Sequence, residues 1–264
     1  MRRPTGFVSS QKTKRRIMHL TTTMKTPYGL QVIESCLACP MMQDRLFCNL
    51  PRQTLQGLDE ISSSATYPKG AILFVEGQEA RGVFVICNGR IKLSASSADG
   101  KSLILRIAEP GEVVGLPGTI SGKPYEVTAE ALEPIQANFI PRDVFLKFLR
   151  EHGEVAVRVA EMLSDIYHAT YREVRYLGLS GSAGEKLARF ILDLAADSSR
   201  TSEGGHADRV ALTLTHDEIA QMLGSSRETV TRLFADFRRK HLIEVHGSTL
   251  VITNKAGLEK TFEP

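Results

Sequence analysis

The stretch that most constrains the fold begins at residue 214 and reads LTHDEIAQMLGSSRETVTRLFADFRRKHLIEVHGSTLVITN. Thr215 and Glu218 have the spacing of a capping box, in which the side chain of each residue bonds to the backbone of the other. The apolar residues that follow predict a helix that stops at Gly224 and a second helix after that glycine. Two short helices joined by a tight turn are typical of the helix-turn-helix motif. The segments LIEVH and TLVIT flank a Gly-Ser turn and predict a two-stranded wing.

The second of these helices is expected to carry the residues that read DNA. Ser225 or Ser226 can cap it, and its inner face is apolar. The candidate DNA-binding residues are Ser226, Arg227, Glu228, Thr231, Arg232 and Arg238. Arginine can donate two hydrogen bonds to guanine, and glutamate can accept one from cytosine. Arg238, Arg239 and Lys240 lie at the helix end, where cations complement the helix dipole and can meet phosphate.

The middle of the chain predicts β structure. Between Tyr67 and Phe139, short apolar runs such as AILFVEG, GVFVICNG and RIKLSAS are punctuated by glycines. The runs follow one another about every ten residues, which is typical of a compact antiparallel barrel or sandwich. Asp99 and Gly100 predict a hairpin turn. We expect a β-roll in this part of the chain.

From Asp143 onward the pattern is helical, and a long helix is expected over residues 155–177. Its apolar residues fall into two stripes. One stripe holds Val155, Val159, Met162, Ile166 and Ala169, and the other holds Ala156, Ala160, Leu163, Tyr167, Thr170 and Val174. Two stripes suit a helix that packs on its own roll and on the same helix of a second copy, so we expect a homodimer. GLSGSAG, at 178–184, predicts a hinge.

Composition narrows the class of protein further. The chain has 264 residues, 42% of them hydrophobic, which suits one large or two modest globular domains. No apolar run approaches the ~20 residues that a membrane helix needs. The sequence shows neither a base–nucleophile motif nor a phosphate loop, so we expect no enzyme. Residues 1–30 carry seven Lys or Arg and no acid, which predicts a flexible tail, with a transit peptide or a nucleic-acid-binding arm as alternatives.

These patterns resemble the CRP/FNR superfamily of bacterial transcription regulators, which includes the cyclic-AMP receptor and the fumarate-nitrate reduction regulators. GSSRETVTRLF is similar to its recognition-helix motif, and the run from YPKGAILFVEG to GEVVGL is similar to its β-roll motif. The resemblance implies an α+β fold: an N-terminal cyclic-nucleotide-binding-type β-roll, a long dimerisation helix and a C-terminal winged helix-turn-helix. It also implies a cytoplasmic homodimer on double-stranded DNA, at an inverted repeat with a TGTGA- or TTGAT-like core, and RNA polymerase as a partner of an activator.

The resemblance and the patterns together predict the domain organisation. We expect a basic flexible tail at 1–30, a cysteine-bearing segment at 31–55, a sensory β-roll at 56–142, a dimerisation helix at 143–178 and a winged helix-turn-helix domain at 179–264.

The resemblance also implies where a cyclic nucleotide would bind. Nucleotide-binding members have a glutamate for the ribose and an Arg-Ser pair for the phosphate, but this sequence has Leu116 and Pro124-Tyr125 there. A buried phosphate needs cations and hydrogen-bond donors around it. We therefore expect no cyclic AMP, and another small ligand in the roll stays open as an alternative signal.

Three of the four cysteines crowd into one segment, ESCLACPMMQDRLFC, as Cys36, Cys39 and Cys48. Clustered cysteines outside a disulfide framework favour metal or redox chemistry. The resemblance to the fumarate-nitrate type implies an oxygen-sensitive [4Fe–4S] cluster at this place. A structural zinc site and a thiol–disulfide switch remain alternatives.

The fourth ligand of such a cluster has no counterpart at the position that the resemblance implies. Where the fumarate-nitrate type has its fourth cysteine, this chain has Asn138, and its own fourth cysteine is Cys87. We take Cys87 as the candidate fourth ligand and Asp44 as an alternative. A different class of protein, an iron–sulfur electron carrier, also fits the cysteines alone. A gel shift with genomic fragments discriminates the two, because an electron carrier has no preference for a DNA sequence.

Overall fold

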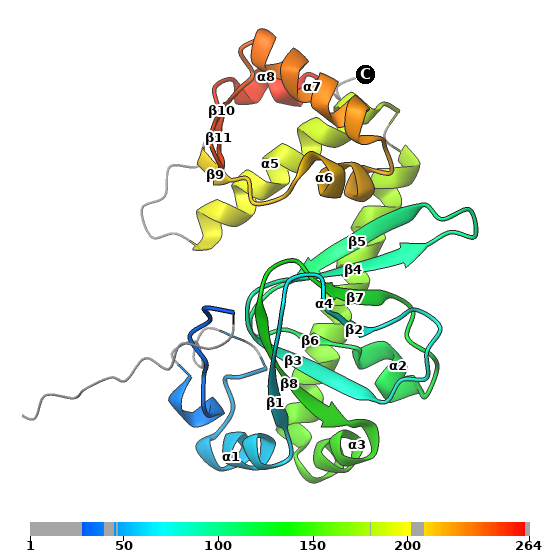
Figure 1. The fold of residues 1–264 in the computed structure, drawn as a ribbon, viewed down its shortest axis with the longest axis vertical. Coiled ribbons are helices and arrows are strands. Elements are labelled where there is room, and N and C mark those ends of the chain that lie inside the picture. The colour runs from blue at the N-terminus through cyan, green and yellow to red at the C-terminus, as the bar shows by residue number, and fades with distance from the viewer. Residues whose placement is uncertain (1–27, 40–44, 46, 180, 202–208, 262–264) are drawn as a thin grey trace, which may run out of the picture.

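A β-roll, a long helix and a smaller helical domain follow one another along the chain (Figure 1). The computed structural model describes residues 28–39, 45, 47–179, 181–201 and 209–261. Most of the basic tail predicted at 1–30, and the alternative ligand Asp44, lie outside the described residues. The predicted α+β fold class is confirmed.

The roll consists of two four-stranded antiparallel sheets, with strand orders β1-β8-β3-β6 and β2-β7-β4-β5. The strands are β1 (Ser63–Tyr67), β2 (Ile72–Phe74), β3 (Gly82–Asn88), β4 (Ile91–Ser96), β5 (Ser102–Ala108), β6 (Val113–Val114), β7 (Thr128–Ala131) and β8 (Ile135–Pro141). Strand β3 has a run of five buried residues because helices cover one of its faces and the roll interior the other. The predicted Asp99-Gly100 turn joins β4 to β5, with Gly100 at a φ of 81°.

Short helices cover one end of the roll. They are η1 (Cys36–Ala38), α1 (Arg52–Glu60), α2 (Leu116–Ser121) and α3 (Arg142–Glu151). The apolar face of α1 buries Leu55 and Leu58 in one core with Phe145 of α3. Figure 1 shows α1 and α3 side by side at the end of the roll remote from the C-terminal domain.

The segment 143–178, which we expected to form one dimerisation helix, contains two helices. The first helix, α3, ends at His152, whose φ of −126° is not helical. The second helix, α4 (Gly153–Leu179), begins at the next residue. The first predicted stripe packs on the roll, since Val155, Val159 and Met162 are buried in the core shared with α1 and α3. Large apolar side chains of α4 remain exposed on another face: Val157 (58%), Tyr167 (64%), Tyr171 (59%) and Val174 (63%).

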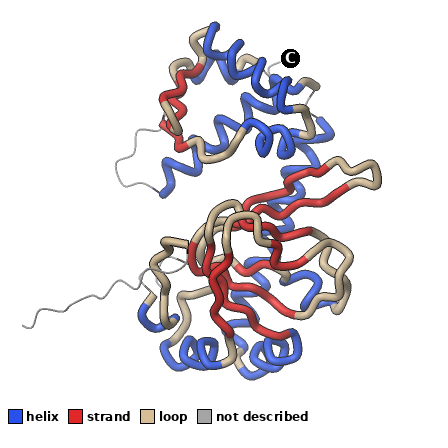
Figure 2. The backbone as a smooth tube through the Cα atoms, in the orientation of Figure 1, coloured by secondary structure: helices blue, strands red, loops and turns tan. Residues whose placement is uncertain are grey.

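The C-terminal domain has a core of its own, separate from that of the roll. Its elements are α5 (Ala183–Thr201), β9 (Arg209–Ala211), α6 (His216–Leu223), α7 (Arg227–Arg239), β10 (Ile243–His246), β11 (Thr249–Ile252) and α8 (Lys255–Glu259). Among the described residues, the strands that lie outside the roll form one small sheet in this domain, with the order β10-β11-β9 (Figure 2). Among those residues, none of the helices is long and apolar enough to cross a membrane.

Candidate nucleic-acid interface and cysteine cavity

The helix-turn-helix forms where the sequence predicts it. Thr215 and Glu218 make both bonds of the capping box, with Glu218 N–H donating to Thr215 Oγ1 at 3.2 Å and Thr215 N–H donating to Glu218 Oε2 at 2.7 Å. Gly224 ends α6 in the left-handed conformation, at a φ of 60°. Ser226, rather than Ser225, caps α7 by accepting the backbone N–H of Thr229 at 3.2 Å. These caps fix the angle at which α7 leaves the turn.

All six candidate DNA-binding residues lie on the outside of the domain. Ser226, Arg227, Glu228, Thr231 and Arg232 are exposed in the first two turns of α7 or at its cap, and Arg238 is exposed in the last turn. The opposite face of α7 buries Val230, Phe234 and Phe237 in the domain core. One helix therefore separates a packing face from a polar face, as a recognition helix must.

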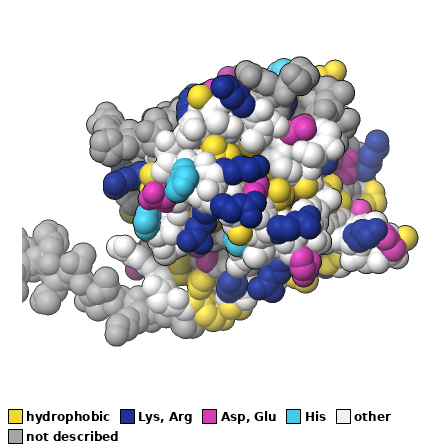
Figure 3. All heavy atoms as spheres, turned by 90° about the horizontal axis from the view of Figure 1, so that it is seen from above, with side chains coloured by type: hydrophobic (Ala, Val, Ile, Leu, Met, Phe, Trp, Pro, Cys, Tyr) yellow, Lys and Arg dark blue, Asp and Glu magenta, His cyan; other side chains and the backbone are white. Residues whose placement is uncertain are grey.

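The arginines of this face differ in the partners that they have. No ion pair among the described residues involves Arg227, Arg232 or Arg238, so their guanidinium groups are available to an external anion or base. Arg239 and Lys240 both pair with Asp236, the latter at 2.9 Å. Figure 3 looks onto this end of the molecule and shows Lys and Arg side chains spread across it. The surface is therefore suited to a polyanion such as DNA.

His216 has a role that the sequence did not indicate. Its ring stacks on Phe234 of α7, with centroids 4.7 Å apart and planes 14° apart, and its Nδ1 lies 2.9 Å from Thr231 Oγ1. The first helix of the motif thus holds a residue of the recognition face in place. Its signal in the sequence was only the position after the cap, which many residue types occupy.

The four cysteines of the chain line one cavity of about 170 Å³, beside the roll. Cys36 begins η1, Cys39 follows it, Cys48 precedes α1, and Cys87 comes from the far end of β3. All four are free thiols and half-buried. Cys87 therefore lies beside the three N-terminal cysteines, although it is 39 positions after Cys48 in the sequence; their predicted role as metal ligands stays a prediction.

Two side chains of the roll region hold the cysteine segment in place. Gln136 of β8, which is 1% exposed, pairs with both backbone groups of Ile33, at 2.8 and 2.7 Å. Asp59 of α1 accepts from Ser35 Oγ at 2.7 Å and from the backbone N–H of Cys36 at 3.0 Å. Burial acts to raise the pKa of Asp59, but these hydrogen bonds outweigh it and lower the pKa below its ordinary value. The segment is thus anchored at both the strand and the helix.

A bulge in β3 positions the fourth cysteine. The pairing of β3 with β8 shifts between Ile86 and Asn88, so Cys87 is the extra residue on its strand. Bulges re-aim the side chain at the point where they occur. Asn138 lies on the adjacent strand β8 and its amide is 3.6 Å from Cys36 Sγ. Cys87 therefore lies on the strand that pairs with the one carrying Asn138.

Two buried polar atoms without partners lie in the otherwise largely apolar lining of this cavity. Asn138 Oδ1 and Arg45 Nε, both in its lining, are buried and have no hydrogen-bond partner among the described residues. Buried polar atoms without partners are rare because they forfeit their hydration. Both atoms are therefore open to a hydrogen-bond partner from outside the described residues.

Three thiols of the cavity have raised pKa values. Burial, together with the neighbouring Cys39, raises the pKa of Cys48 to about 11. Burial and the two neighbouring thiols Cys48 and Cys39 raise the pKa of Cys87 to about 12. Burial and a hydrogen bond with Asp59 raise the pKa of Cys36 well above its ordinary value. Burial favours the uncharged form of these three thiols, so a cation such as a metal ion beside them would be needed to stabilise their thiolates.

The roll interior differs from a nucleotide site at the two positions singled out in the sequence. Leu116 is fully buried. Tyr125 is 5% exposed, stacks on Phe74 with centroids 4.0 Å apart, and donates its hydroxyl to the carbonyl of Gly82 at 2.7 Å. A largely apolar cavity of about 200 Å³ between the roll and α4 includes Arg106, which pairs with Glu112.

Both parts of this architecture match known protein families. A "Cyclic nucleotide-binding domain" model matches residues 65–152 and a "Crp-like helix-turn-helix domain" model matches residues 185–261. The CRP-like cAMP-activated global transcriptional regulator of Mycobacterium tuberculosis is 26% identical over 215 residues, which cover 81% of this chain and 95% of that protein. The transcriptional activator protein FnrA of Stutzerimonas stutzeri is 28% identical over 230 residues, covering 84% and 90%. The structure of a CooA mutant from Carboxydothermus hydrogenoformans aligns with a TM-score of 0.69 at 22% identity, over 85% of this chain and 95% of that chain, which concerns the fold.

A sensory-type roll joined by a long helix to a winged helix-turn-helix defines a DNA-binding transcription regulator. The chain belongs to the CRP/FNR superfamily of these regulators. The predicted superfamily, fold class and regulatory function are thereby confirmed. The names of these relatives do not point to one common signal.

Proposed function

We propose that this regulator responds to oxygen or redox state through an iron–sulfur cluster held by Cys36, Cys39, Cys48 and Cys87. The observation that carries the proposal is that all four cysteines of the chain line one cavity. Cysteine thiolates are the usual ligands of such clusters, four to a [4Fe–4S] unit. When bound, the cluster would supply a group that oxygen can dismantle, which the protein itself lacks.

The donor set fits a cluster better than a single metal ion. A structural zinc ion needs four ligands converging on one point. Among the described residues, no three His, Cys, Asp or Glu side chains converge in that way. A [4Fe–4S] cluster would take four separate cysteine ligands, and Cys36, Cys39, Cys48 and Cys87 around this cavity would supply them. The unpartnered Arg45 Nε would offer a donor toward cluster sulfur, and such hydrogen bonds tune the reduction potential.

We further propose that cyclic nucleotides are not the signal. The buried Leu116 offers no acceptor for a ribose hydroxyl, and the ring of Tyr125 fills space inside the roll. Arg106, the cation in the lining of the cavity next to α4, already has Glu112 as its partner. A phosphate there would have to break this pair and remain under-coordinated.

The protein is proposed to bind an inverted repeat as a cytoplasmic homodimer. The exposed apolar side chains of α4 are spaced at 167, 171 and 174, which places them on one face of the helix. Regulators of this superfamily bind two-fold symmetric DNA, and a symmetric site is matched by two copies of the protein. The exposed face of α4 would pack on α4 of the second copy. Arg227, Glu228 and Arg232 would then meet base edges in each half-site, and Arg238 phosphate.

The cluster is tested by purification and reconstitution without oxygen. The wild-type protein is expected to be brown, to absorb broadly in the visible range and to contain iron and sulfide. The variants Cys36→Ser/Cys39→Ser and Cys87→Ser should both be colourless, whereas Cys87→Ser would stay brown if Cys87 were only a core residue. A colourless wild-type protein that binds zinc instead, or that forms a disulfide between two of the N-terminal cysteines, would refute the cluster.

A further inference from the structure

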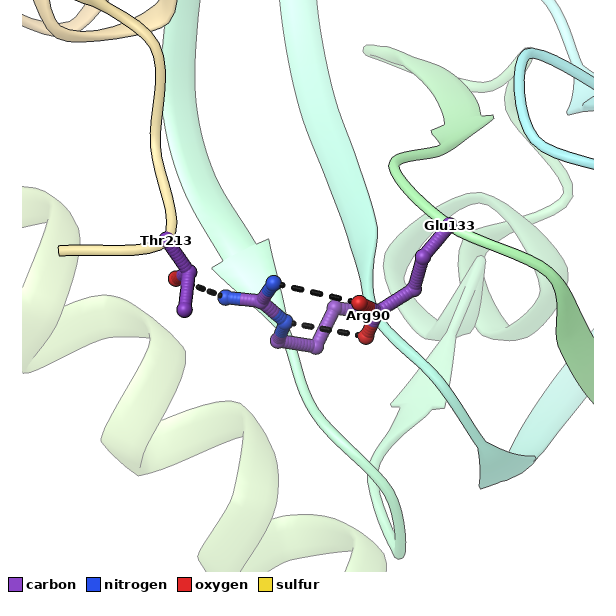
Figure 4. Close-up of polar contacts among 3 residues, drawn as sticks. All are labelled: Arg90, Glu133 and Thr213. Carbon is purple, nitrogen blue, oxygen red and sulfur yellow. Dashed lines mark hydrogen bonds and ion pairs between the residues drawn. The ribbon is translucent and has the colours of Figure 1, made fainter. Parts of the chain in front are cut away.

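One side chain of the roll reaches the DNA-binding domain. Arg90, in the turn between β3 and β4, donates from Nη1 to Thr213 Oγ1 at 2.5 Å (Figure 4). Its other two nitrogens bind Glu133 in a two-point pair, with Nε at 3.0 Å and Nη2 at 3.2 Å. The bidentate pair orients the guanidinium group so that its remaining nitrogen points at Thr213.

Arg90 is closely tied to the cysteine cavity through the backbone. It lies three residues after Cys87, and the turn between them is packed tightly. A Cβ on Gly89 would stand 2.5 Å from the carbonyl of Pro134, and the φ of Gly89 is 75°. A turn that is this crowded moves as a unit with the strand end that carries Cys87.

The partner of Arg90 is tied to the same cavity by a second route. Glu133 precedes β8, and Gln136, three residues later, binds the backbone of Ile33 in the cysteine segment. Asn88, next to Cys87, also reaches this segment, with its amide 3.4 Å from the carbonyl of Gln31. A rearrangement of the cysteine segment would therefore displace both residues of the Arg90–Glu133 pair.

Thr213 is well placed to receive such a displacement. It lies between β9, which pairs with the wing strand β11, and Thr215, the cap of α6. Helix α6 itself lies against strand β5 of the roll. The contact thus joins the roll to the start of the helix-turn-helix, at a point separate from α4.

We propose that the Arg90–Thr213 hydrogen bond is a coupling contact, through which the state of the cysteine cavity biases the position of the helix-turn-helix. The proposal rests on the proposed function only in taking that cavity as the sensory site. Coupling between two sites is reciprocal, so DNA binding must also change the cavity. That reciprocal effect can be measured whether or not a cluster is bound.

The test compares Thr213→Val, which removes the hydroxyl and keeps the shape, with the wild type and with a matched control. Lys92→Gln is the control because Lys92 pairs with Glu130 at 3.0 Å between neighbouring strands of the roll, without reaching the DNA-binding domain. The first readout is the ratio of the dissociation constants for DNA before and after the cluster-containing protein is exposed to air. The second is the alkylation rate of Cys87 in cluster-free full-length protein, with and without a saturating duplex that the wild type selects from a random pool.

In the wild type and in Lys92→Gln, the duplex is expected to change the alkylation rate of Cys87 about fivefold or more, and in Thr213→Val the effect should fall to less than half of that. Glu133→Gln, which loosens the orientation of Arg90, should act in the same direction. A Thr213→Val protein that keeps the wild-type response in both readouts overturns the proposal, as does a wild type whose Cys87 ignores DNA. A colourless wild type that still shows the alkylation effect supports the coupling while refuting the cluster.

Discussion

At the residue scale, a residue just after α7 has a left-handed backbone conformation that the sequence does not predict. His241 has a φ of 53°, the one positive value outside glycine in the described residues. Leu242 N–H donates to the carbonyl of Phe237 at 2.9 Å and His241 N–H to that of Arg238 at 3.0 Å, which together form a Schellman motif. This position after a helix is usually glycine, because a Cβ in the left-handed region is strained by about 1–2 kcal/mol.

We therefore predict that His241→Gly stabilises the C-terminal domain. Relief of the strain outweighs the greater backbone freedom of glycine in the unfolded chain, so the net gain is about 0.5–1 kcal/mol in the free energy of unfolding. Thermal or urea denaturation of the purified protein measures it. A gain of the same size in His246→Gly, which lies in the wing strand β10 and not among the positive-φ residues, would show that loss of the imidazole and not the backbone is responsible.

The second prediction at this scale concerns base readout. Arg232 is exposed and has no ion-pair partner among the described residues, so its guanidinium is free to donate to a guanine. Arg232→Ala should weaken specific binding by about 1–3 kcal/mol per half-site while the protein stays folded. Arg239→Ala is the matched control, since Arg239 lies on the same helix and pairs with Asp236. Equal losses of specific affinity in the two variants, measured by gel shift, would contradict the assignment.

At the element scale, the local signals of the C-terminal half were accurate. The capping box, the glycine stop and the glycine-turn wing all depend on residues within a few positions of one another, and the structure confirms them. The apolar stripes of α4 were harder to assign. A stripe states that a face is buried but not what buries it, and the break at His152 follows from packing of α3 under the roll.

The structure changes the residue with which dimerisation should be tested. Ile166, an obvious choice from the stripes, lines the cavity between α4 and the roll, so a charge there would disturb folding. Tyr171→Glu places the charge on the exposed apolar face and should convert dimers into monomers in sedimentation. Glu161→Gln, which removes only the exposed ion pair with Arg158, should leave the dimer intact. A wild type that sediments as a monomer in every redox state would refute the interface.

At the scale of the whole molecule, the sequence predicted the order of parts but not the contacts between them. The three N-terminal cysteines are visible as a motif, whereas the place of Cys87 beside them depends on a bulge and on the register of β3 with β8. The Arg90–Thr213 contact joins residues 123 apart. Neither contact can be predicted from a local sequence pattern, because both arise from the packing of elements that are remote in the chain.

The central claim is that the cysteine cavity controls DNA binding. The most direct measurement is the dissociation constant of the protein reconstituted without oxygen for an inverted-repeat duplex, before and after exposure to air. We predict that the brown protein binds the duplex, that air bleaches it and weakens binding by at least about fivefold, and that Cys36→Ser/Cys39→Ser shows no such change. A wild-type protein without bound iron, whose affinity for the duplex is the same before and after air, would contradict the account.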